Sequence, residues 1–376
     1  MKNFNSKTSR AWAEIDLTAL LANADVLRAR LPSGCEIMAV VKADAYGHGA
    51  QTVAAHLSRY GVRAFAVATV AEGVALRQSG LLGKILVMSG TPPGDAPLLE
   101  EYNLTQLVAD GYHARALDRT GRRLRVHIAI DTGMHRLGIE PPSLAEIESV
   151  YACENLTVEG MGTHLAVPDS LLPGDVEFTN KQCEKFTQLT DILRRKGFDT
   201  GKLHIQSSYG VLNYPGLKCD YARAGIALYG ALDKQCLSAA AETVPVLSLR
   251  ARVAQVRTID AGESVSYGRT FTASRPMRIA TVSIGYADGV PRQMSGGECL
   301  VLGRRAPVVG RICMDMLMLD VTEIGEVQPD DIVTLIGRDG GEAIACAEFA
   351  ARCGTITHEV LSRLGPRLPR VYLAAD

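Results

Sequence analysis

Lys42 stands at the end of the short apolar run IMAVV and begins the segment KADAYGHG. A lysine that follows a buried strand is partly desolvated, which lowers its pKa and makes its amine nucleophilic toward carbonyl carbons. The competing interpretation is a surface lysine whose stem lies on apolar atoms while its ammonium stays in water. Tyr46 adds a hydroxyl donor, and the Gly-His-Gly tail adds a flexible turn. These neighbours favour a reactive site at Lys42.

Polar residues also end several later apolar runs. If those runs are parallel strands of one barrel, their ends meet at a single rim, and that convergence is stronger evidence for a site than any one motif. The candidates are Arg136 in DTGMHRLG, His164 in GTHLAVPDS, Ser207 and Ser208 in IQSS, and Arg223 with Gly225 in RAGIALYG. Ser208 and the Gly225-Ile226 backbone follow the last two runs, where barrel enzymes often bind phosphate. Serine and glycine are also common turn residues, so alone they are weak evidence.

Eight apolar, strand-like runs precede residue 230 and alternate with segments of helical character. Residues 14–32 come before them and have apolar residues at helical spacing, with Asp16 as a possible N-cap. The runs are IMAVV, AFAVATV, ILVMS, LTQLVAD, RVHIAID, VEGMGTH, LHIQSS and YARAGIALYG. This alternation predicts an α/β fold with a (β/α)8 TIM-type barrel over residues 12–238. A doubly wound sheet or a miscounted set of strands is the alternative.

The sequence pattern changes after Gly230. From there, runs rich in Val, Thr and Gly alternate apolar and polar residues with period two, and no long segment of helical character occurs before EFAARCG. This pattern predicts a separate, mainly β domain over residues 239–376. Its polar candidates are Tyr267 in VSYGRT, Tyr286 in GYADG, and Cys313, Met314 and Asp315 in GRICMDM. A tyrosine between serine and glycine is most often a strand residue with its hydroxyl in water. Cys313 and Asp315 lack a third ligand, so no metal site is predicted.

Composition restricts the possible partners and location. The 376 residues include 40 Lys and Arg against 41 Asp and Glu, which gives no support for a nucleic-acid or membrane-surface partner. The nine cysteines form no CxxC pair, which is typical of reduced thiols in a cytoplasmic protein. No apolar run approaches the roughly 20 residues that span a bilayer, and the polar N-terminus lacks the apolar core of a signal peptide. We therefore expect a cytoplasmic protein, either whole or cut from a longer one.

Six segments together resemble the signature segments of alanine racemases, in the family's order and from about residue 12 to about residue 370. They are VVKADAYGHG, DTGMHRLG, RAGIALYG, VSYGRTF, IGYADG and VGRICMDM. The resemblance implies a barrel followed by a β domain, a pyridoxal 5'-phosphate cofactor, small amino-acid substrates and a homodimer with shared active sites. It also implies interconversion of L- and D-alanine, which supplies D-amino acids for cell-wall peptidoglycan.

The resemblance assigns a role to each matching residue. Lys42 holds pyridoxal phosphate covalently, and Arg223 faces the pyridine nitrogen. Tyr46, Ser208, Gly225 and Ile226 hold the phosphate. Arg136 and Met314 contact the substrate on its carboxylate side. His164 packs beside the cofactor ring and makes a hydrogen bond toward Arg223 or Tyr267. Residues that line the cleft and its entry are Cys313, Asp315 and Tyr286.

Racemisation removes a proton from one face of Cα and returns it on the other, so two bases on opposite faces serve it best. Lys42 would serve one face and Tyr267, from the partner subunit, the other. A phenol gives up its proton at neutral pH only beside positive charge or hydrogen-bond donors, which His164 and Arg223 could supply. Because arginine stays protonated, Arg223 cannot accept a proton from the pyridine ring, and the weaker electron sink limits side reactions.

Two positions depart from the family's pattern. Many alanine racemases carry a carbamylated lysine just before the DTGM segment, where this chain has Ala129, so Arg136 must find another partner such as an anion or water. Where this chain has His358, the family usually has a tyrosine that helps hold the phosphate and shapes the substrate gate. One interpretation is a tolerated substitution, in which His358 serves only the phosphate. The shorter, polar His358 leaves room for a side-chain hydroxyl, so we expect serine as well as alanine to be a substrate. This combination resembles the serine/alanine racemase domains linked to vancomycin resistance, which follow a membrane segment.

Three other functions compete with a racemase. An amino-acid decarboxylase of the same fold would carry a carboxylate at the pyridine nitrogen, where this chain has Arg223. A non-catalytic pyridoxal phosphate carrier would be a single barrel without the domain that holds Tyr267. A metal-dependent barrel hydrolase would need several His or Asp residues at strand ends, where only His164 is well placed.

Overall fold

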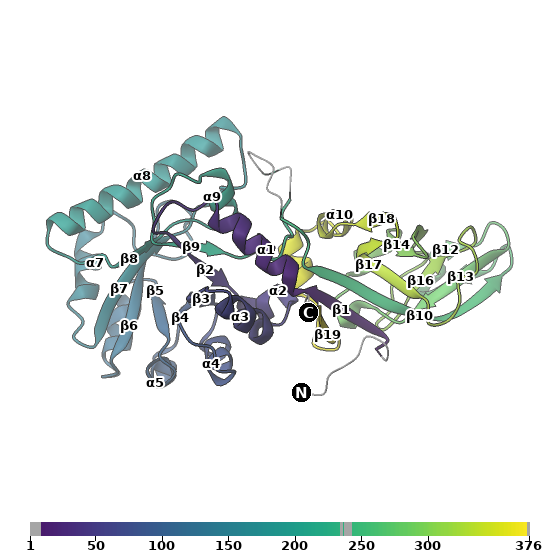
Figure 1. The fold of residues 1–376 in the computed structure, drawn as a ribbon, viewed down its shortest axis with the longest axis horizontal. Coiled ribbons are helices and arrows are strands. Elements are labelled where there is room, and N and C mark those ends of the chain that lie inside the picture. Colours follow the sequence, from purple (N-terminus) through teal and green to yellow (C-terminus); the bar gives the residue numbers. More distant parts are fainter. Residues whose placement is uncertain (1–8, 234–235, 237–242, 374–376) are drawn as a thin grey trace.

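The predicted barrel is confirmed by the structure, a computed structural model that describes residues 9–233, 236 and 243–373. Eight parallel strands close on themselves in sequence order, from β2 round to β9, which pairs with β2 (Figure 1). The strands are β2 (Glu36–Val40), β3 (Ala64–Val67), β4 (Lys84–Val87), β5 (Thr105–Val108), β6 (Leu124–Ile130), β7 (Leu156–Thr163), β8 (Lys202–His204) and β9 (Tyr221–Ala224). Their apolar residues are buried on both faces because helices cover the outside of the barrel.

Helices follow most of the barrel strands and pack on them. They are α1 (Leu17–Arg28), α2 (Lys42–Gly47), α3 (Ala50–Arg59), α4 (Val70–Gln78), α5 (Ala96–Glu101), α6 (Gly111–Asp118), α7 (Leu144–Tyr151), α8 (Pro173–Arg195) and α9 (Ser208–Asn213). The predicted N-cap is confirmed, since the Asp16 carboxylate accepts a hydrogen bond from the Ala19 amide at 2.9 Å. Among the described helices none is long and apolar enough to cross a membrane.

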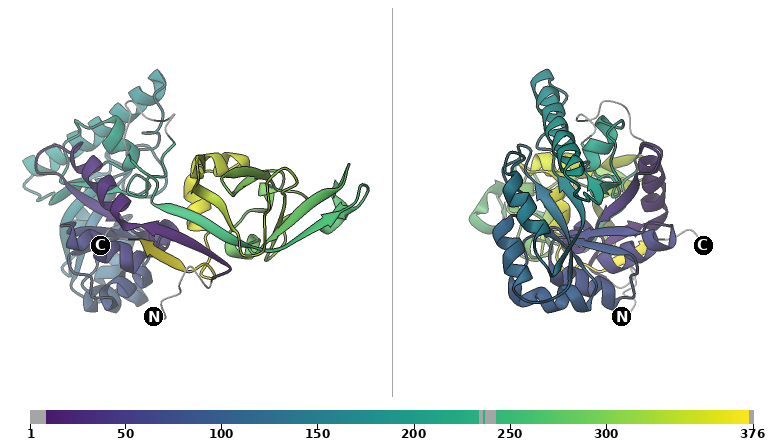
Figure 2. Two further views of the ribbon diagram at one scale, coloured as in Figure 1. Left: turned by 45° about the vertical axis from the view of Figure 1, so that its right-hand side comes forward. Right: turned by 90° about the vertical axis from the view of Figure 1, so that its left-hand side faces the viewer.

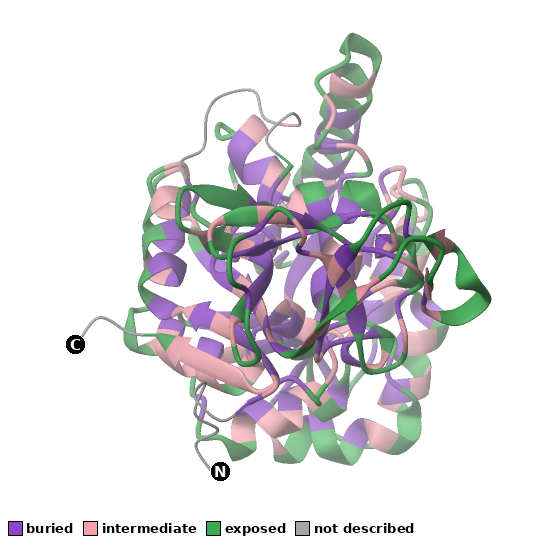
Figure 3. Cartoon of the chain, turned by 90° about the vertical axis from the view of Figure 1, so that its right-hand side faces the viewer, coloured by how far each residue is buried: buried purple, intermediate pink, exposed green. Residues whose placement is uncertain are grey.

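The mainly β domain is a second lobe beside the barrel (Figure 2). Its nine-stranded sheet holds β1 (Ala11–Asp16), β10 (Leu247–Ile259), β13 (Met277–Val282), β14 (Glu298–Val301), β15 (Arg304–Pro307), β16 (Leu317–Asp320), β17 (Ile332–Asp339), β18 (Glu342–Ile344) and β19 (Arg370–Leu373). A small two-stranded sheet of β11 (Ser264–Val265) and β12 (Phe271–Thr272) and the helices α10 (Cys346–Arg352) and α11 (Thr357–Ser362) complete it. Figure 3 looks onto this domain and shows many exposed residues (green) along its loops and strands.

One helix boundary was predicted wrongly. Residues 14–16 belong to β1, which pairs antiparallel with β10 and parallel with β19 in the sheet of the β domain. In the segment AWAEID only the last four residues alternate between buried and less buried, and six residues are too few to separate strand from helix by period. The N-terminal strand thus joins the second lobe before the chain enters the barrel. The boundary predicted between residues 238 and 239 lies outside the described residues.

Candidate active site

A pocket of about 700 Å³ opens at the C-terminal ends of the barrel strands. This is the rim at which barrel enzymes hold their active sites, because the loops after the strands can vary without disturbing the barrel. The proposed residues that line the pocket are Lys42, Tyr46, Arg136, His164, Ser208, Arg223, Gly225, Ile226 and His358. The structure therefore brings together the polar strand ends singled out in the sequence.

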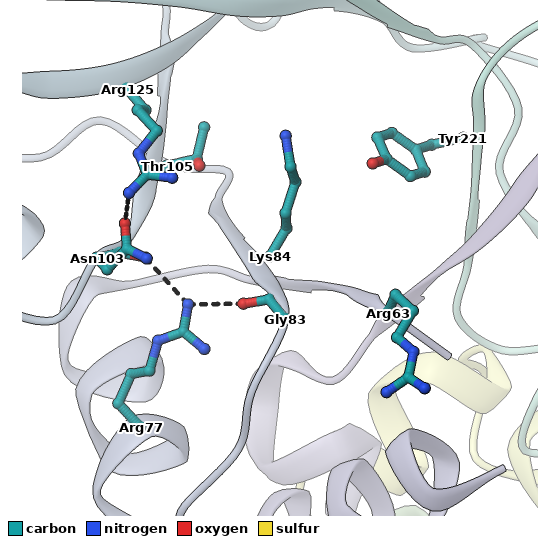
Figure 4. A pocket seen from close by; sticks show the side chains of 8 residues that line it. All are labelled: Arg63, Arg77, Gly83, Lys84, Asn103, Thr105, Arg125 and Tyr221. Atoms are coloured by element: carbon teal, nitrogen blue, oxygen red, sulfur yellow. Dashed lines mark hydrogen bonds between the residues drawn. The ribbon is translucent and has the colours of Figure 1, made fainter. Parts of the chain in front are cut away.

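A second pocket, of about 380 Å³, lies at the opposite, N-terminal end of the barrel (Figure 4). Three of its four cationic side chains already have partners, and one of these, Arg125, donates to Asn103 Oδ1 and lies 3.9 Å from the Glu159 carboxylate. Arg77 donates to four backbone carbonyl oxygens, including that of Gly83 at 2.7 Å, and Lys84 lies 3.1 Å from the Glu159 carboxylate. We therefore place the chemistry at the C-terminal rim.

Lys42 begins a strained turn directly after β2. The four residues from Ala43 to Tyr46 have φ angles of 51–54° and form one turn of left-handed helix. For L-residues this conformation costs roughly 1–2 kcal/mol for each residue, so the surrounding structure must hold it. Burial, with the nearby positive charges of Arg136 and Arg223, lowers the pKa of the Lys42 amine.

Several contacts fix this turn. The Glu72 carboxylate accepts hydrogen bonds from the amides of Ala43 and Ala68, both at 2.7 Å, and joins the turn to the start of α4. Gly47 lies so close to α11 that a Cβ atom there would be 2.3 Å from the Leu361 carbonyl oxygen. At Gly49, a Cβ would collide with the Tyr372 hydroxyl. The two glycines of the YGHG tail are thus needed for close packing against the second lobe.

Tyr46 and Ser208 form a cradle around the loop after β9. The Ser208 hydroxyl accepts hydrogen bonds from the amides of Gly225 at 3.0 Å and Ala227 at 3.1 Å. A Cβ atom on Gly225 would lie 2.8 Å from the Tyr46 hydroxyl oxygen, so only glycine lets the two meet there. Burial raises the pKa of Tyr46 to about 12, which keeps this hydroxyl a hydrogen-bond donor at neutral pH.

Arg223 is buried and its guanidinium is held on all sides. Its Nη1 donates to the His204 carbonyl oxygen at 2.9 Å and to His204 Nδ1 at 2.6 Å. Its Nη2 donates to the carbonyl oxygens of Thr163 and Ile205 and to His164 Nδ1. Burial lowers the pKa of Arg223 to about 10, so the group still carries its charge at neutral pH. These bonds occupy both Nη atoms and leave Nε–H as the donor without a partner among the described residues.

His164 is neutral at pH 7. Burial and the charge of Arg223 lower its pKa to about 3. Because arginine can only donate, the 3.0 Å contact from Arg223 Nη2 requires a bare Nδ1, and the ring proton is on Nε2. His164 therefore offers the pocket a hydrogen-bond donor and not the positive charge considered in the sequence analysis.

Two histidines behind Arg223 were missed by sequence reasoning. His204 Nε2 lies 2.9 Å from His127 Nδ1, so the chain of hydrogen bonds from Arg223 through His204 continues to His127. Two glycines of β7 make room for the rings. A Cβ on Gly162 would lie 1.9 Å from His204 Cε1, and one on Gly160 would lie 2.7 Å from His127 Cε1. A signal was present in the sequence, because His127 stands between Val126 and Ile128 in the predicted strand RVHIAID, and His204 stands between Leu203 and Ile205 in LHIQSS.

Arg136 is exposed at the rim of the pocket and has no hydrogen-bond or ion-pair partner among the described residues. Ala129, where the family often has lysine, lines the same pocket, buried at the end of β6. The loop that carries Arg136 is ordered by Asp131, which accepts hydrogen bonds from the amides of Gly133 and His135. The described residues therefore supply no partner for Arg136, and the anion or water expected from the sequence stays a prediction.

His358, at the start of α11, brings the second lobe into the pocket. Its ring centroid lies 5.9 Å from that of Tyr46 in an edge-on arrangement. Burial, with the nearby charge of Lys42, lowers the pKa of His358. The histidine thus stands beside the residue proposed to hold the phosphate and within the field of the reactive amine.

The proposed residues of the β domain gather elsewhere. Cys313 Sγ lies 3.5 Å from the Ser266 hydroxyl, and the Cys313 carbonyl oxygen accepts a hydrogen bond from the Tyr286 amide at 3.1 Å. Tyr267 follows Ser266 and has 71% of its surface exposed. The full group, which we call the tyrosine surface, is Tyr267, Tyr286, Cys313, Met314 and Asp315. None of these residues lines the barrel pocket of the described chain.

Comparison with known proteins agrees with both lobes. The family described as alanine racemase, N-terminal domain, matches residues 15–233, and alanine racemase, C-terminal domain, matches residues 246–372. An alanine racemase from Geobacter sp. (strain M21) is 41% identical over 373 residues, covering 96% of this chain and 98% of the relative. An amino-acid racemase from Enterococcus faecalis is 42% identical over 367 residues, and this chain covers 51% of that relative's length.

Solved structures give the same result. Alanine racemase from Clostridium difficile 630 superposes with a TM-score of 0.92 at 33% identity, covering 98% of this chain and 96% of that one. Alanine racemase from Bacillus anthracis, solved with bound L-Ala-P, gives a TM-score of 0.91 at 34% identity, covering 97% and 95%. With both domains matched in order along almost the whole length, the chain belongs to the alanine racemase family of enzymes.

Proposed function

We propose that this protein is a pyridoxal phosphate-dependent racemase that interconverts the enantiomers of alanine and also of serine. The observation that carries the proposal is the pocket in which the Lys42 amine, with its lowered pKa, shares one cavity with the buried Arg223 guanidinium. An amine of this kind is suited to attack an aldehyde. Arg223 distinguishes the site from that of a decarboxylase of this fold, for which we expect a carboxylate at the same place.

The residues present fit pyridoxal phosphate. The cavity of about 700 Å³ is large enough for a small cofactor and an amino acid. Tyr46, Ser208 and the backbone at Gly225 and Ile226 would hold the phosphate, and the Nε–H of Arg223 would face the pyridine nitrogen. Bound pyridoxal phosphate would supply the electron sink that makes the Cα proton of the substrate acidic.

Arg223 sets how strong that sink is. It keeps its proton at neutral pH and has no lone pair to share, so it can donate to the ring nitrogen but cannot protonate it fully. The contacts from Thr163, His204 and Ile205 hold the guanidinium in place without reorganisation. A weaker sink would leave less negative charge on the cofactor, which would favour return of the proton to Cα over side reactions.

Lys42 and Tyr267 would move the proton on opposite faces of Cα. The lowered pKa of Lys42 would leave more of its amine unprotonated and so able to accept a proton from Cα. His164 presents its Nε2–H toward the pocket, where it can stabilise a phenolate. Arg136 and Met314 would bind the substrate on its carboxylate side, and Cys313, Asp315 and Tyr286 would line the entry.

The separation of the Lys42 pocket from the tyrosine surface within one chain supports a homodimer. The Lys42 pocket contains no residue of the tyrosine surface of its own chain, and Tyr267 is largely exposed. A two-fold axis would bring the tyrosine surface of each protomer over the pocket of the other, as expected for a self-complementary interface. Each protomer would then complete its partner's site.

An absorbance spectrum tests the cofactor. Protein loaded with pyridoxal phosphate is expected to absorb in the visible range, and borohydride should bleach the band and leave the cofactor covalently attached to a peptide that contains Lys42. A colourless protein that binds no pyridoxal phosphate would refute the proposal. A coloured protein that releases carbon dioxide from amino acids, and does not racemise them, would establish the decarboxylase instead.

His358→Tyr is expected to shift substrate preference from serine toward alanine. The larger ring would fill the space and remove the polar nitrogen that we assign to the serine hydroxyl, so the ratio of kcat/KM for L-serine to that for L-alanine should fall about tenfold. His56→Tyr on α3 is the control, outside the pocket. Chiral detection of both products measures the ratio. An unchanged ratio, or a wild-type preference for alanine of several orders of magnitude, would rule out a serine role for His358.

The products fit cell-wall synthesis. We propose that the protein acts in the cytoplasm and supplies D-amino acids for peptidoglycan. The similarity to the Enterococcus faecalis amino-acid racemase supports a substrate range wider than alanine.

A further inference from the structure

Two cysteines face each other across the seam at which the barrel closes. Cys35 precedes β2, the first strand of the barrel, and Cys219 precedes β9, the last. Their sulfur atoms are 3.6 Å apart, although the residues are 184 positions apart in the sequence. Within the described part of the chain, which includes all nine cysteines, they are the only two thiols in contact.

The backbone on either side holds the two sulfurs at this place. The Glu36 amide donates to the Asp220 carbonyl oxygen at 2.9 Å, and β2 and β9 pair in parallel register from Glu36 and Tyr221 onward. The Asp220 amide donates to the Leu203 carbonyl oxygen at 2.8 Å, and its carboxylate accepts from the Leu203 amide. The cysteines therefore stand on anchored strand ends, and bond formation needs a small approach of two side chains.

We infer that Cys35 and Cys219 form a reversible disulfide under oxidising conditions. This bond would link the start of β2 to the start of β9, where the barrel closes. Both thiols are half-buried, so a small oxidant can reach them without unfolding of the protein. Neither lies in the catalytic rim, because they lie at the opposite ends of the strands that lead to Lys42 and Arg223. The inference is independent of the proposed substrates and cofactor.

The two thiols differ in chemical role. The contact with the Cys35 thiol lowers the pKa of Cys219, with help from the Arg223 charge and neighbouring amides. The same contact, with burial, raises the pKa of Cys35. Cys219 is therefore the nucleophile and Cys35 the resolving thiol.

The reaction balances with a small disulfide such as oxidised glutathione. The Cys219 thiolate attacks one sulfur of oxidised glutathione, and the first glutathione leaves as a thiolate. Cys35 then loses its proton and attacks the Cys219 sulfur of the mixed disulfide, and the second glutathione leaves. The two protein thiols are oxidised by two electrons, the glutathione disulfide is reduced to two thiols, and the protons of the protein thiols end on glutathione.

Peptide mapping tests the bond. Folded protein is equilibrated with oxidised and reduced glutathione, its free thiols are blocked with iodoacetamide, and the digest is analysed by mass spectrometry. We expect one major linked pair, Cys35 with Cys219, which dithiothreitol reverses. The Cys35→Ser variant should stop at glutathione bound to Cys219, whereas Cys219→Ser should gain almost no adduct at Cys35. Cys236→Ser, which removes another half-buried thiol, should form the link as the wild type does.

Three outcomes would overturn the inference. The first is the absence of the Cys35–Cys219 peptide under conditions that modify other cysteines. The second is a link that forms only after denaturant is added. The third concerns stability, because closing so long a loop removes conformations from the unfolded chain. The oxidised wild type should unfold several degrees above the reduced protein while Cys35→Ser shows no such shift, and equal unfolding temperatures would contradict the proposed disulfide.

Discussion

Replacing Tyr267 with phenylalanine is expected to slow racemisation by roughly 10²–10⁴-fold, the usual contribution of one acid/base group. The change removes a hydroxyl from an exposed residue that does not line the pocket of its own chain, so folding should be unaffected. The loss should be unequal between the two faces of Cα. In deuterated water, one enantiomer should still exchange its Cα proton without inverting, because Lys42 continues to serve its own face. The other enantiomer should exchange very slowly.

Exchange from each enantiomer, followed by mass spectrometry with chiral separation, measures this difference. The control is Tyr112→Phe, since Tyr112 is similarly exposed but lies on α6 of the barrel. If both enantiomers of Tyr267→Phe lose exchange equally, while Tyr112→Phe is unaffected, the assignment of two bases is wrong.

Lys42→Ala is expected to lower racemase activity by roughly 10⁴-fold, because the change removes both the covalent tether and the second base. Pyridoxal phosphate should still bind through the phosphate cradle of Tyr46 and Ser208, but more weakly. Borohydride should no longer attach it to the protein. Added methylamine should restore part of the activity by supplying an amine in the space left by the side chain.

Lys84→Ala is the matched control for Lys42→Ala, because Lys84 lies at the other mouth of the barrel (Figure 4). It should retain activity and covalent attachment. Covalent cofactor at a different lysine in Lys42→Ala, with activity retained, would refute the role of Lys42.

Much of the fold could be predicted because its strands are buried on both faces. Runs such as AFAVATV and ILVMS have no polar alternation, which is what a parallel barrel strand requires. β1 could not be predicted, since its neighbours β10 and β19 are hundreds of residues away and a six-residue segment has too little period. Pairing over such a distance is decided by tertiary packing.

Site residues that come at the ends of strands could be predicted from the sequence. Residues that hold those site residues in position could not. Lys42, His164 and Ser208 come within four residues of the ends of β2, β7 and β8, so the strand pattern alone places them at one rim. The left-handed turn from Ala43 to Tyr46 could not be expected, because ordinary residues avoid that conformation. The role of Glu72 depends on contacts made across the barrel rim.

Mixing the two inactive variants shows whether the two bases of one active site come from different protomers. Lys42→Ala and Tyr267→Phe are unfolded together at equal amounts, refolded with pyridoxal phosphate and assayed for racemisation. If each site combines Lys42 of one protomer with Tyr267 of the other, mixed dimers contain one intact site, and random pairing should restore about a quarter of wild-type activity. A mixture no more active than the separate variants would show that the two residues do not meet across a dimer interface and would contradict the account.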